Sequence, residues 1–492
     1  MRKQIGTMLI LLAIGVGAMA QNDRDAFRYA QYSPTGTARY SALSGATGAF
    51  GSDFSCLSAG NPAGIGLFKR AEFTITPAIS GNRITTIYNG EKQKQPKSDF
   101  NVNNLGLVLA AALDSTTGWR YIQLATGLNN LARYDGLSVA AGQNEGGATF
   151  FDYVASAANG TKFNSLSDAF GTDFFPSGFV LDAFDRYLID TIGGDDKYWG
   201  VNANLNQQQR KRTSGYLNEY IISFGGNYDD KLFLGATLGI PFFRYTQTVT
   251  YTESSNPYYD TLILVDRFNE RATGINLKLG IIYQPVKYLR LGAAFHTPTL
   301  YPNVKTTYQK TIDVWMPENS DYSDIGCGYD DKGAFNYTLR TPYHAMANIA
   351  FIYKRLGFIN IDYEYVDYTV SYLQSDSYNF LTENENISQY YKGTHTIRAG
   401  AELNISPLVL RVGGSYSTNP YTKEIEKDGS RYTVSGGIGF KKKAFFIDFA
   451  YMYRFYKDKD IFYTYENSTL SPYTMDFVNQ VFALTIGWKM KM

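Results

Sequence analysis

Histidines are the residues of this chain best suited to hold a metal ion or to transfer protons, and there are three of them: His296, His344 and His395. The alternation of the surrounding segments places His296 on the inner face of a strand and turns His395 outward. Metal ligands must converge on one point, so these positions predict no metal site. His296 is the one inward-facing histidine that the pattern clearly supports as an axial ligand for haem.

Nucleophilic catalysis would need a nucleophile held by a base and an orienting group, and we find no such set of residues. The glycine-rich stretch Ser435–Gly439 lies in a strand pattern and lacks the following helix that a phosphate-binding loop requires. We therefore predict that the protein is not an enzyme, with no catalytic residues and no cofactor.

Three arginines fall on the expected inner face of their strands: Arg290, Arg398 and Arg411. A guanidinium group binds a carboxylate through paired hydrogen bonds, so each is a candidate contact for the carboxylate of a ligand. The alternative is a structural ladder of charges across neighbouring strands, which barrels use to fill their interiors. The carboxylates that would complete such a ladder are Asp362, Glu364 and Glu402.

Period-two alternation of apolar and polar residues predicts the strands that would carry these side chains. It is clear in 274–283 and in 289–296, which are separated by a short turn. It recurs in 358–365 and closes the chain in 482–492. A soluble sandwich alternates too, so the connections must decide between a sandwich and a membrane barrel.

Short and long connections alternate along the expected strands, as they do in outer-membrane barrels with periplasmic turns and extracellular loops. A sandwich would not explain this difference in length. We therefore predict an all-β membrane protein, an antiparallel transmembrane β-barrel of about 14 strands, with both chain ends in the periplasm. The short turns lie near Leu113–Gly118, Tyr228–Lys231, Gln284–Lys287, Lys354–Gly357, Asn404–Pro407 and Lys441–Lys443, and the long segments near Tyr88–Asp99, Asp135–Ser214, Ser254–Asp260, Tyr301–Lys332, Ser371–Lys392, Thr418–Arg431 and Tyr456–Tyr473.

Composition agrees with this class. The 492 residues include 41 tyrosines, 32 phenylalanines and 46 glycines, which favours strands and turns, and amphipathic rings suit membrane interfaces. With 46 basic and 45 acidic residues the net charge is +1, so there is no electrostatic case for nucleic acid. Cys56 and Cys327 are too few for a disulfide framework, and whether they pair is left open.

The first twenty residues predict a secretory signal peptide, because Arg2 and Lys3 precede a short apolar run that ends in Ala18-Met19-Ala20. Cleavage there would leave a mature chain that begins at Gln21. No later segment offers the roughly 18 apolar residues that a transmembrane helix requires. An exported chain with a strand pattern of this kind is expected in the bacterial outer membrane.

Residues 21–70 precede the first expected strand and do not alternate. They suggest short helical pieces separated by glycine and serine, of a size that suits a plug inside a barrel. The segment closes with Asn61-Pro62-Ala63, where proline restricts the preceding residue and the asparagine side chain can bond nearby backbone groups. These residues alone would also fit a simple junction between plug and barrel.

The Asn61-Pro62-Ala63 element after a glycine-rich helical segment, followed by the strand pattern of 72–79, resembles the FadL family of outer-membrane transporters. The segments 395–402 and 410–416 are similar to the tenth and eleventh strands of that family. The resemblance covers essentially the whole mature chain. It implies a fourteen-stranded barrel (71–492) with an N-terminal hatch (21–70), and transport of long-chain fatty acids or other hydrophobic compounds.

The resemblance also implies a lateral opening where the third strand kinks inward beside the hatch. The third strand is expected over 119–134, and its alternation falters at Gly127, Asn129 and Asn130, which are therefore candidates for a lateral gate. The alternative is that this stretch has already emerged above the bilayer. Two departures from the family are a large insertion at about 135–214, expected to form a lid or a ligand-collecting surface, and the non-aromatic last residue, Met492.

The sequence thus predicts a monomeric outer-membrane channel, in contact with membrane lipid, for passive uptake of a hydrophobic ligand such as a fatty acid. Two alternatives stay open. A general porin should have an open polar lumen without a fifty-residue plug, and a receptor for a ligand such as haem should have a buried axial ligand.

Overall fold

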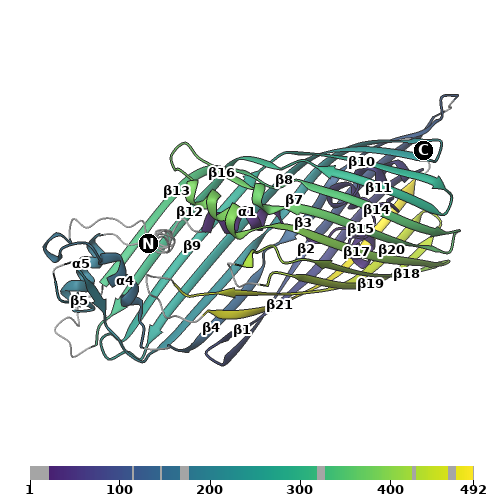
Figure 1. The fold of residues 1–492 in the computed structure, drawn as a ribbon. Coiled ribbons are helices and arrows are strands. Elements are labelled where there is room, and N and C mark those ends of the chain that lie inside the picture. Colours follow the sequence, from purple (N-terminus) through teal and green to yellow (C-terminus); the bar gives the residue numbers. More distant parts are fainter. Residues whose placement is uncertain are drawn as a thin grey trace, which may run out of the picture.

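The computed structural model describes residues 21–113, 116–144, 147–166, 177–194, 196–317, 327–423, 428–463 and 472–490. The expected signal peptide and Met492 lie outside the described residues. The chain forms one long antiparallel β-barrel with short helices in its lumen, and a helical lobe covers the end opposite the C-terminus (Figure 1).

The sheet closes because β1 pairs with β2 on one side and with the last strand, β21, on the other. The barrel has 14 strands, as the alternation of the sequence predicted. Some barrel strands are drawn in two pieces, since β8 pairs with both β9 and β10. The strands are β1 (Ala71–Tyr88), β2 (Glu91–Ala112), β3 (Trp119–Arg133) with β4 (Gly136–Gln143), β7 (Asn206–Tyr228), β8 (Leu232–Ser254), β9 (Thr261–Thr273) with β10 (Asn276–Val286), β11 (Leu289–His296) with β12 (Leu300–Trp315), β13 (Cys327–Arg340) with β14 (His344–Tyr353), β15 (Gly357–Asp367) with β16 (Tyr372–Gln374), β17 (Gly393–Ile405), β18 (Leu408–Ser417), β19 (Arg431–Lys442), β20 (Phe445–Asp460) and β21 (Tyr473–Met490).

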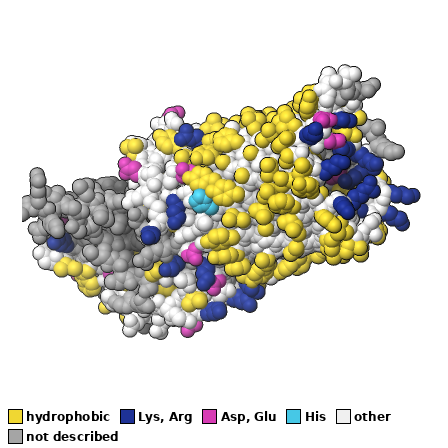
Figure 2. All heavy atoms as spheres, turned by 45° about the vertical axis from the view of Figure 1, so that its right-hand side comes forward, with side chains coloured by type: hydrophobic (Ala, Val, Ile, Leu, Met, Phe, Trp, Pro, Cys, Tyr) yellow, Lys and Arg dark blue, Asp and Glu magenta, His cyan; other side chains and the backbone are white. Residues whose placement is uncertain are grey.

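The outer face of the barrel carries an apolar band. Every second residue of a strand points outward, so leucines such as Leu234 and Leu238 of β8 are exposed while Phe233 between neighbours is buried. Figure 2 shows hydrophobic side chains spread over the middle of the barrel, with lysine and arginine gathered at the end where the C-terminus lies. Among the described residues, no helix is long and apolar enough to span a bilayer.

The short turns lie at the C-terminal end of the barrel, as predicted, but two predicted long segments were wrong. Most of Tyr301–Lys332 belongs to β12 and β13, which pair with each other. Tyr88–Asp99 is the tip and second strand of a tight hairpin, turned by Asn89 and Gly90, both with positive φ. Its strand has polar residues on both faces because it lies beyond the apolar band. Period-two alternation is therefore missing there, although the segment is extended.

The expected insertion at 135–214 is also partly strand, because β4 and β7 run through its two ends as a paired ladder. The connection between these strands is 144–205, whose described part contains short helices that pack with the ends of β8, β9 and β12 around a common apolar core. The buried Glu253 carboxylate accepts the Phe150 backbone N–H at 3.0 Å and so attaches the first of these helices to the barrel. The elements of this lobe are α4 (Phe150–Ala158), η2 (Phe163–Ser165), α5 (Ser177–Asp185), β5 (Ile189–Thr191) and β6 (Tyr198–Gly200).

Short helices of the N-terminal segment lie inside the barrel, as expected for the fold class. We call residues 21–70 the hatch. Thr37 caps one of its helices by accepting the Tyr40 N–H, and Gly60 is the C-cap of another. The helices of the hatch are α1 (Gln21–Ala30), α2 (Ala38–Ala42), α3 (Cys56–Ala59) and η1 (Pro62–Leu67), while η3 (Tyr368–Val370) and α6 (Leu381–Tyr390) lie in an outer connection.

Candidate functional site

Asn61 ties the end of the hatch to the barrel wall. Its side-chain Nδ2 donates to the backbone carbonyls of Ile281 on β10 and Ala293 on β11, both at 3.2 Å, and to Asn348 Oδ1 at 3.1 Å. Its Oδ1 accepts the Ala63 N–H at 3.0 Å, which caps η1. The side chain is fully buried. Its one amide group therefore forms hydrogen bonds with the hatch and with three strands of the wall.

Glycines line the part of the barrel wall that faces Asn61-Pro62-Ala63. A Cβ atom at Gly280 would lie 2.1 Å from Asn61 Oδ1, and one at Gly235 would lie 2.2 Å from the Pro62 carbonyl oxygen. Because both contacts are far below van der Waals distance, only glycine lets the hatch backbone approach the sheet so closely. We call Asn61, Pro62, Ala63 and these wall glycines the dock.

A buried ion pair borders the dock. Lys278 Nζ donates to the Glu219 carboxylate and to the Ser58 carbonyl of the hatch, and both charged side chains are shielded from water. Ser58 Oγ also donates to Glu219 at 2.5 Å. Each charge is therefore compensated by a partner and by the hatch, as a buried pair requires.

His296 and His395 lie as the sequence predicted, and His344, for which no position was predicted, lies beside His296. His296 points inward and its Nε2 lies 2.8 Å from the Gly60 carbonyl, while His395 is on the outer face. Sequence reasoning missed that His344 sits beside His296 across β11 and β14, with ring centroids 6.0 Å apart. His344 Nδ1 bonds Glu364 at 2.7 Å. Among the described residues no group of three or more metal-ligating side chains converges.

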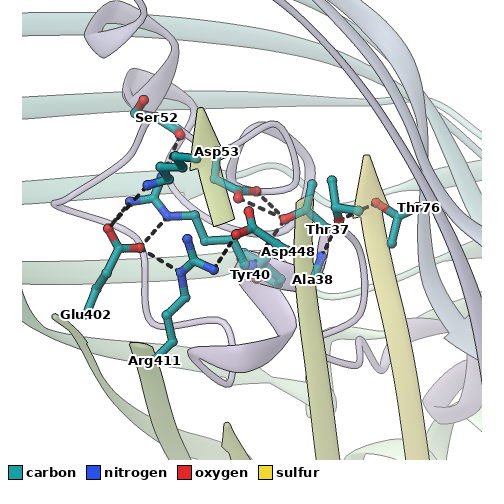
Figure 3. Close-up of polar contacts among 12 residues, drawn as sticks. Thr37, Ala38, Tyr40, Ser52, Asp53, Thr76, Glu402, Arg411 and Asp448 are labelled. Carbon is teal, nitrogen blue, oxygen red and sulfur yellow. Dashed lines mark hydrogen bonds and ion pairs between the residues drawn. The ribbon is translucent and has the colours of Figure 1, made fainter. Parts of the chain in front are cut away.

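A charged cluster joins the middle of the hatch to the opposite wall. Arg39 Nε donates to Glu402 at 2.8 Å, and Arg411 bridges Glu402 and Asp448 at 2.8 and 2.6 Å (Figure 3). Burial raises the pKa of the Asp53 carboxyl beside them, although Arg39 opposes the shift. The cluster borders a cavity of about 30 Å³, room for a water molecule or two.

The three candidate arginines do not gather around one ligand position. Arg411 is held by the two carboxylates just described, and Arg398 pairs with Glu364. Arg290 has no ion-pair partner among the described residues and donates to Gln284 Oε1 at 2.9 Å and to the Phe50 carbonyl at 3.0 Å. The geometry of Arg398 and Arg411 thus matches the structural ladder of charges, and a ligand-binding role for the three stays a prediction.

The β2–β3 ladder is interrupted in its outer half. It runs from Ala112–Tyr121 to Asn104–Asn129, and beyond that point β2 pairs only with β1 while β3 and β4 pair only with β7. β4 turns inward and lies against the inner face of β1, where Asn82 Nδ2 donates to the Asp135 carbonyl at 2.6 Å. We call the unpaired stretch, residues 100–103 of β2 opposite 130–132 of β3, the seam.

Irregular residues explain where the seam begins. Pro77 on β1 lacks an N–H, and the β1–β2 register shifts beside it so that Asn103 has no partner. A second shift, at Leu131, lets β3 bend away from β2. Asn103 is 1% exposed, and neither amide atom has a hydrogen-bond partner in the described structure. Sequence reasoning missed this pair, although a proline inside a strand pattern is itself a bulge signal.

Two of the three candidate gate residues, Gly127 and Asn129, lie just before the seam, and the third, Asn130, is its first residue on β3. Gly127 pairs normally on both sides, yet its φ of +155° and the 2.1 Å that would separate its Cβ from the Leu105 carbonyl exclude any larger residue. Asn129 and Asn130 are both buried. The β2–β3 ladder is therefore unbroken at Gly127 and Asn129, and it stops at Asn130, the last of the three candidates.

The hatch covers the inner side of the seam. Ser33 N donates to the Leu131 carbonyl at 2.7 Å, and Thr35 Oγ1 to the Asn130 carbonyl at 3.0 Å, so the hatch bonds the carbonyls that β2 leaves free. Ser55 Oγ donates to Asn129 Oδ1 at 2.9 Å. On the outer side the seam is flanked by lipid-facing Phe100 and Val102, which are 67% and 42% exposed.

Comparison with solved structures finds the same fold. The chain matches a FadL homologue from Pseudomonas aeruginosa with a TM-score of 0.55 and 14% identity, over 93% of this chain and 99% of that one. It matches the toluene transporter TodX of P. putida with a TM-score of 0.53 and 12% identity (93% and 99% covered). The monoaromatic hydrocarbon channel CymD gives 0.51 and 12% (94% and 99%).

No protein-family profile matches the sequence, and a search of curated proteins also finds no match. TodX and CymD are described as a toluene transporter and a monoaromatic hydrocarbon channel, and identities this low establish the fold alone. The resemblance seen in the sequence is thus confirmed by the arrangement of the whole chain. The protein has the fold of the FadL-type channels, a fourteen-stranded barrel with short N-terminal helices in its lumen.

Proposed function

We propose that the protein is a bacterial outer-membrane channel for the passive uptake of hydrophobic small molecules, such as long-chain fatty acids or monoaromatic hydrocarbons. In this proposal the hatch controls passage, and the ligand leaves sideways through the seam into the membrane. The observation that carries the proposal is the unpaired seam, faced by lipid-exposed Phe100 and Val102 outside and by the hatch inside.

Free energy favours this route for an apolar ligand. Returning apolar surface to periplasmic water costs about 25 cal/mol per Å², whereas passage into lipid avoids that cost. An ordinary barrel wall prevents sideways passage because every backbone group pairs with the neighbouring strand. At the seam the Asn130 and Leu131 carbonyls accept hydrogen bonds from the hatch instead. A movement of the hatch away from the seam would therefore break only a few hydrogen bonds. The unpaired amide of Asn103 could then bond the polar end of a ligand.

The two alternative functions have less support. A general porin would leave its lumen open, whereas here the hatch is buried in the lumen and tied to the wall at the dock, at the charged cluster and at the seam. A haem receptor would use His296, but its Nε2 already bonds the Gly60 carbonyl and the ring is 2% exposed.

Uptake by cells tests the substrate class. A bacterial strain that lacks its own hydrophobic-compound channels would express the full chain and receive labelled palmitate, labelled toluene or a labelled disaccharide. We expect faster uptake of one or both hydrophobic probes and no change for the disaccharide. Faster disaccharide uptake with no gain for the hydrophobic probes would favour a porin and contradict the proposal.

Deleting Asn103 tests the lateral route. The deletion removes the residue that has no partner and lets Val102 and Asn104 alternate regularly, so the β2 edge can extend toward β3. We expect uptake of the hydrophobic probe to fall at least fivefold while the barrel still resists unfolding by detergent. The control is Asn103→Ala, which keeps the bulge and should keep most of the uptake. Normal uptake by the deletion variant would place the route elsewhere.

A further inference from the structure

Six basic residues gather on the outer face of the barrel just beyond the apolar band. On β8 the outward positions are apolar up to Phe242, and Arg244 is the first charged one. The basic residues lie on adjacent strands and belong to the side of the barrel that carries the long connections. We call them the outer basic patch: Arg212 (β7), Arg244 (β8), Arg267 and Arg271 (β9), Lys305 (β12) and Lys332 (β13), all exposed.

Three members of the patch stand in one cross-strand row. Arg271 pairs in register with Arg244 on one side and with Lys305 on the other. The Cβ atoms of directly opposed residues lie about 4.5–5.5 Å apart, and like charges at that separation destabilise a sheet. A row of three positive charges is therefore unfavourable unless something outside the chain neutralises it.

The chain itself does not neutralise this row. In the described part of the structure none of the six basic residues makes an ion pair. Glu270, the sequence neighbour of Arg271, points into the lumen, where it accepts hydrogen bonds from Thr306 at 2.9 Å and Tyr337 at 2.8 Å. The nearest outward carboxylate, Asp330, lies further from the apolar band and accepts from Gln309 at 3.1 Å.

The patch also borders a hollow of about 500 Å³ between β9, β12 and β13. Small residues of its lining, Thr307 and Ala334, lie in one cross-strand row. This row lies between the row of Arg267 and Lys332 and the row of Arg271 and Lys305, so long basic side chains stand on two sides of a depression. Arg267 is positioned by a 3.1 Å hydrogen bond to Gln309 Oε1, which orients its guanidinium group. A depression edged with cations suits a polar headgroup that carries more than one negative charge.

We propose that the outer basic patch binds the phosphorylated sugar headgroup of lipopolysaccharide, the glycolipid of the outer leaflet. Arginine forks match phosphate oxygens, and the acyl chains of the same molecule would lie on the apolar band directly below, against Leu238 and Leu277, which are 38% and 42% exposed. The inference rests on the outer-membrane location in the proposed function, because the patch faces the outer leaflet only there. It does not depend on transport.

Binding by the purified full chain tests the inference. The probes are rough lipopolysaccharide, the same preparation after enzymatic removal of its phosphates, and phosphatidylglycerol. The variant is Arg244→Ala with Arg271→Ala and Lys305→Ala. The matched control removes three exposed basic residues from the short turns at the other end, Lys287→Ala with Arg355→Ala and Lys442→Ala. We expect the patch variant to lose affinity for lipopolysaccharide on the order of 100-fold and the control to stay within about twofold.

The wild type alone also tests the inference, should a variant fail to fold. Removal of the phosphates is expected to weaken its binding at least tenfold, and phosphatidylglycerol is expected to bind more weakly than lipopolysaccharide. Equal losses in the two triple variants, equal binding of the dephosphorylated probe, or equal binding of phosphatidylglycerol would overturn the inference. Failure of uptake with intact lipopolysaccharide binding would refute only the proposed function. In detergent without lipopolysaccharide the patch variant should unfold at the wild-type temperature or above it, because like-charge repulsion is removed.

Discussion

The hatch meets the barrel wall in two contrasting ways, at the dock and at the seam. At the dock a single side chain, Asn61, makes four hydrogen bonds, and glycines hold the backbones in contact. At the seam, single hydrogen bonds from Ser33 and Thr35 reach carbonyls that the neighbouring strand leaves free. Under the proposed function, the dock would be the fixed side of the hatch and the seam its movable side, so that a pivot about the dock would uncover the seam.

The largest expected effect on this contrast comes from Asn61→Asp. The substitution keeps the shape of the side chain but replaces the Nδ2 donor with an oxygen that faces the Ile281 and Ala293 carbonyls and Asn348 Oδ1. A buried charge without partners costs about 3–5 kcal/mol, so we expect the hatch to leave the dock. Hydrogen exchange of residues 21–70 measures this release. Asn61→Ala should cost about 2 kcal/mol, because it removes bonds without adding a charge. A smaller effect of Asp than of Ala would contradict the geometry of the dock.

Gly280→Val should also disrupt the dock, through sterics alone. Its Cβ would lie 2.1 Å from Asn61 Oδ1 and 2.8 Å from the Ala63 backbone nitrogen, so the hatch must move by an ångström or more. We expect destabilisation of the hatch by about 2–3 kcal/mol, at the upper end of overpacking costs. Gly436→Val is the matched control, since its Cβ would meet only the Arg411 carbonyl at 3.6 Å. Equal proteolysis of the hatch in both variants would show that the approach at Gly280 is unimportant.

Arg39→Ala should have a smaller effect than either change at the dock. The loss of Arg39 removes the bonds to Glu402 and to the Ser52 carbonyl, but Glu402 keeps its 2.8 Å bond to Arg411. Because no carboxylate is left without a partner, we expect a cost of about 1–2 kcal/mol in hatch stability. Arg39→Lys should recover part of it. A loss as large as that of Asn61→Asp would mean that the charged cluster, and not the dock, fixes the hatch.

The smallest expected signal is the reactivity of Cys56, which lies beside the dock. Burial raises the pKa of its thiol from an ordinary 9.0 to about 12, and the thiol donates weakly to the Asn61 carbonyl at 3.4 Å. Between about pH 9 and pH 12 the Cys56 thiol therefore stays protonated in the folded chain, whereas it ionises in the unfolded chain. In a Cys327→Ser background we expect no maleimide labelling at pH 8 within an hour. Labelling should appear when Asn61→Asp releases the hatch. Rapid labelling of the undisturbed hatch would show that this region opens readily.

Much of the barrel could be predicted because its alternation has a simple physical cause. Where one face of a strand meets lipid and the other the lumen, as in 274–283, every second residue is apolar, and turn residues mark the ends. Beyond the apolar band this contrast disappears. The segments Tyr88–Asp99, the two ends of 135–214 and most of Tyr301–Lys332 therefore suggested loops although they are strands.

The candidate site was predictable only where its signal is local. Asn61-Pro62 predicts a turn because of the two residue types alone, and its position just before the first strand predicted that it ends the hatch. The pairing of His296 with His344 and the bulge at Asn103 beside Pro77 depend on strand register. The sequence of one strand does not state which residues of its neighbour lie opposite. The sequence pointed to Gly127, where the ladder is intact, and to Asn130, where it stops. The shift at Leu131 that lets β3 bend away has no signal in the sequence.

A reversible cross-link at the seam tests the central claim most directly. Ser55→Cys with Asn129→Cys joins two side chains that are in hydrogen-bond contact at 2.9 Å, and Ser44→Cys with Ser435→Cys joins another hatch contact, at 2.7 Å, on the opposite wall. Uptake of a labelled hydrophobic probe is measured with each pair oxidised and then reduced. We predict that the seam cross-link lowers uptake at least tenfold and that reduction restores it. The cross-link on the opposite wall should leave at least half of the wild-type uptake. Undiminished uptake with the seam fully cross-linked would contradict lateral release under hatch control.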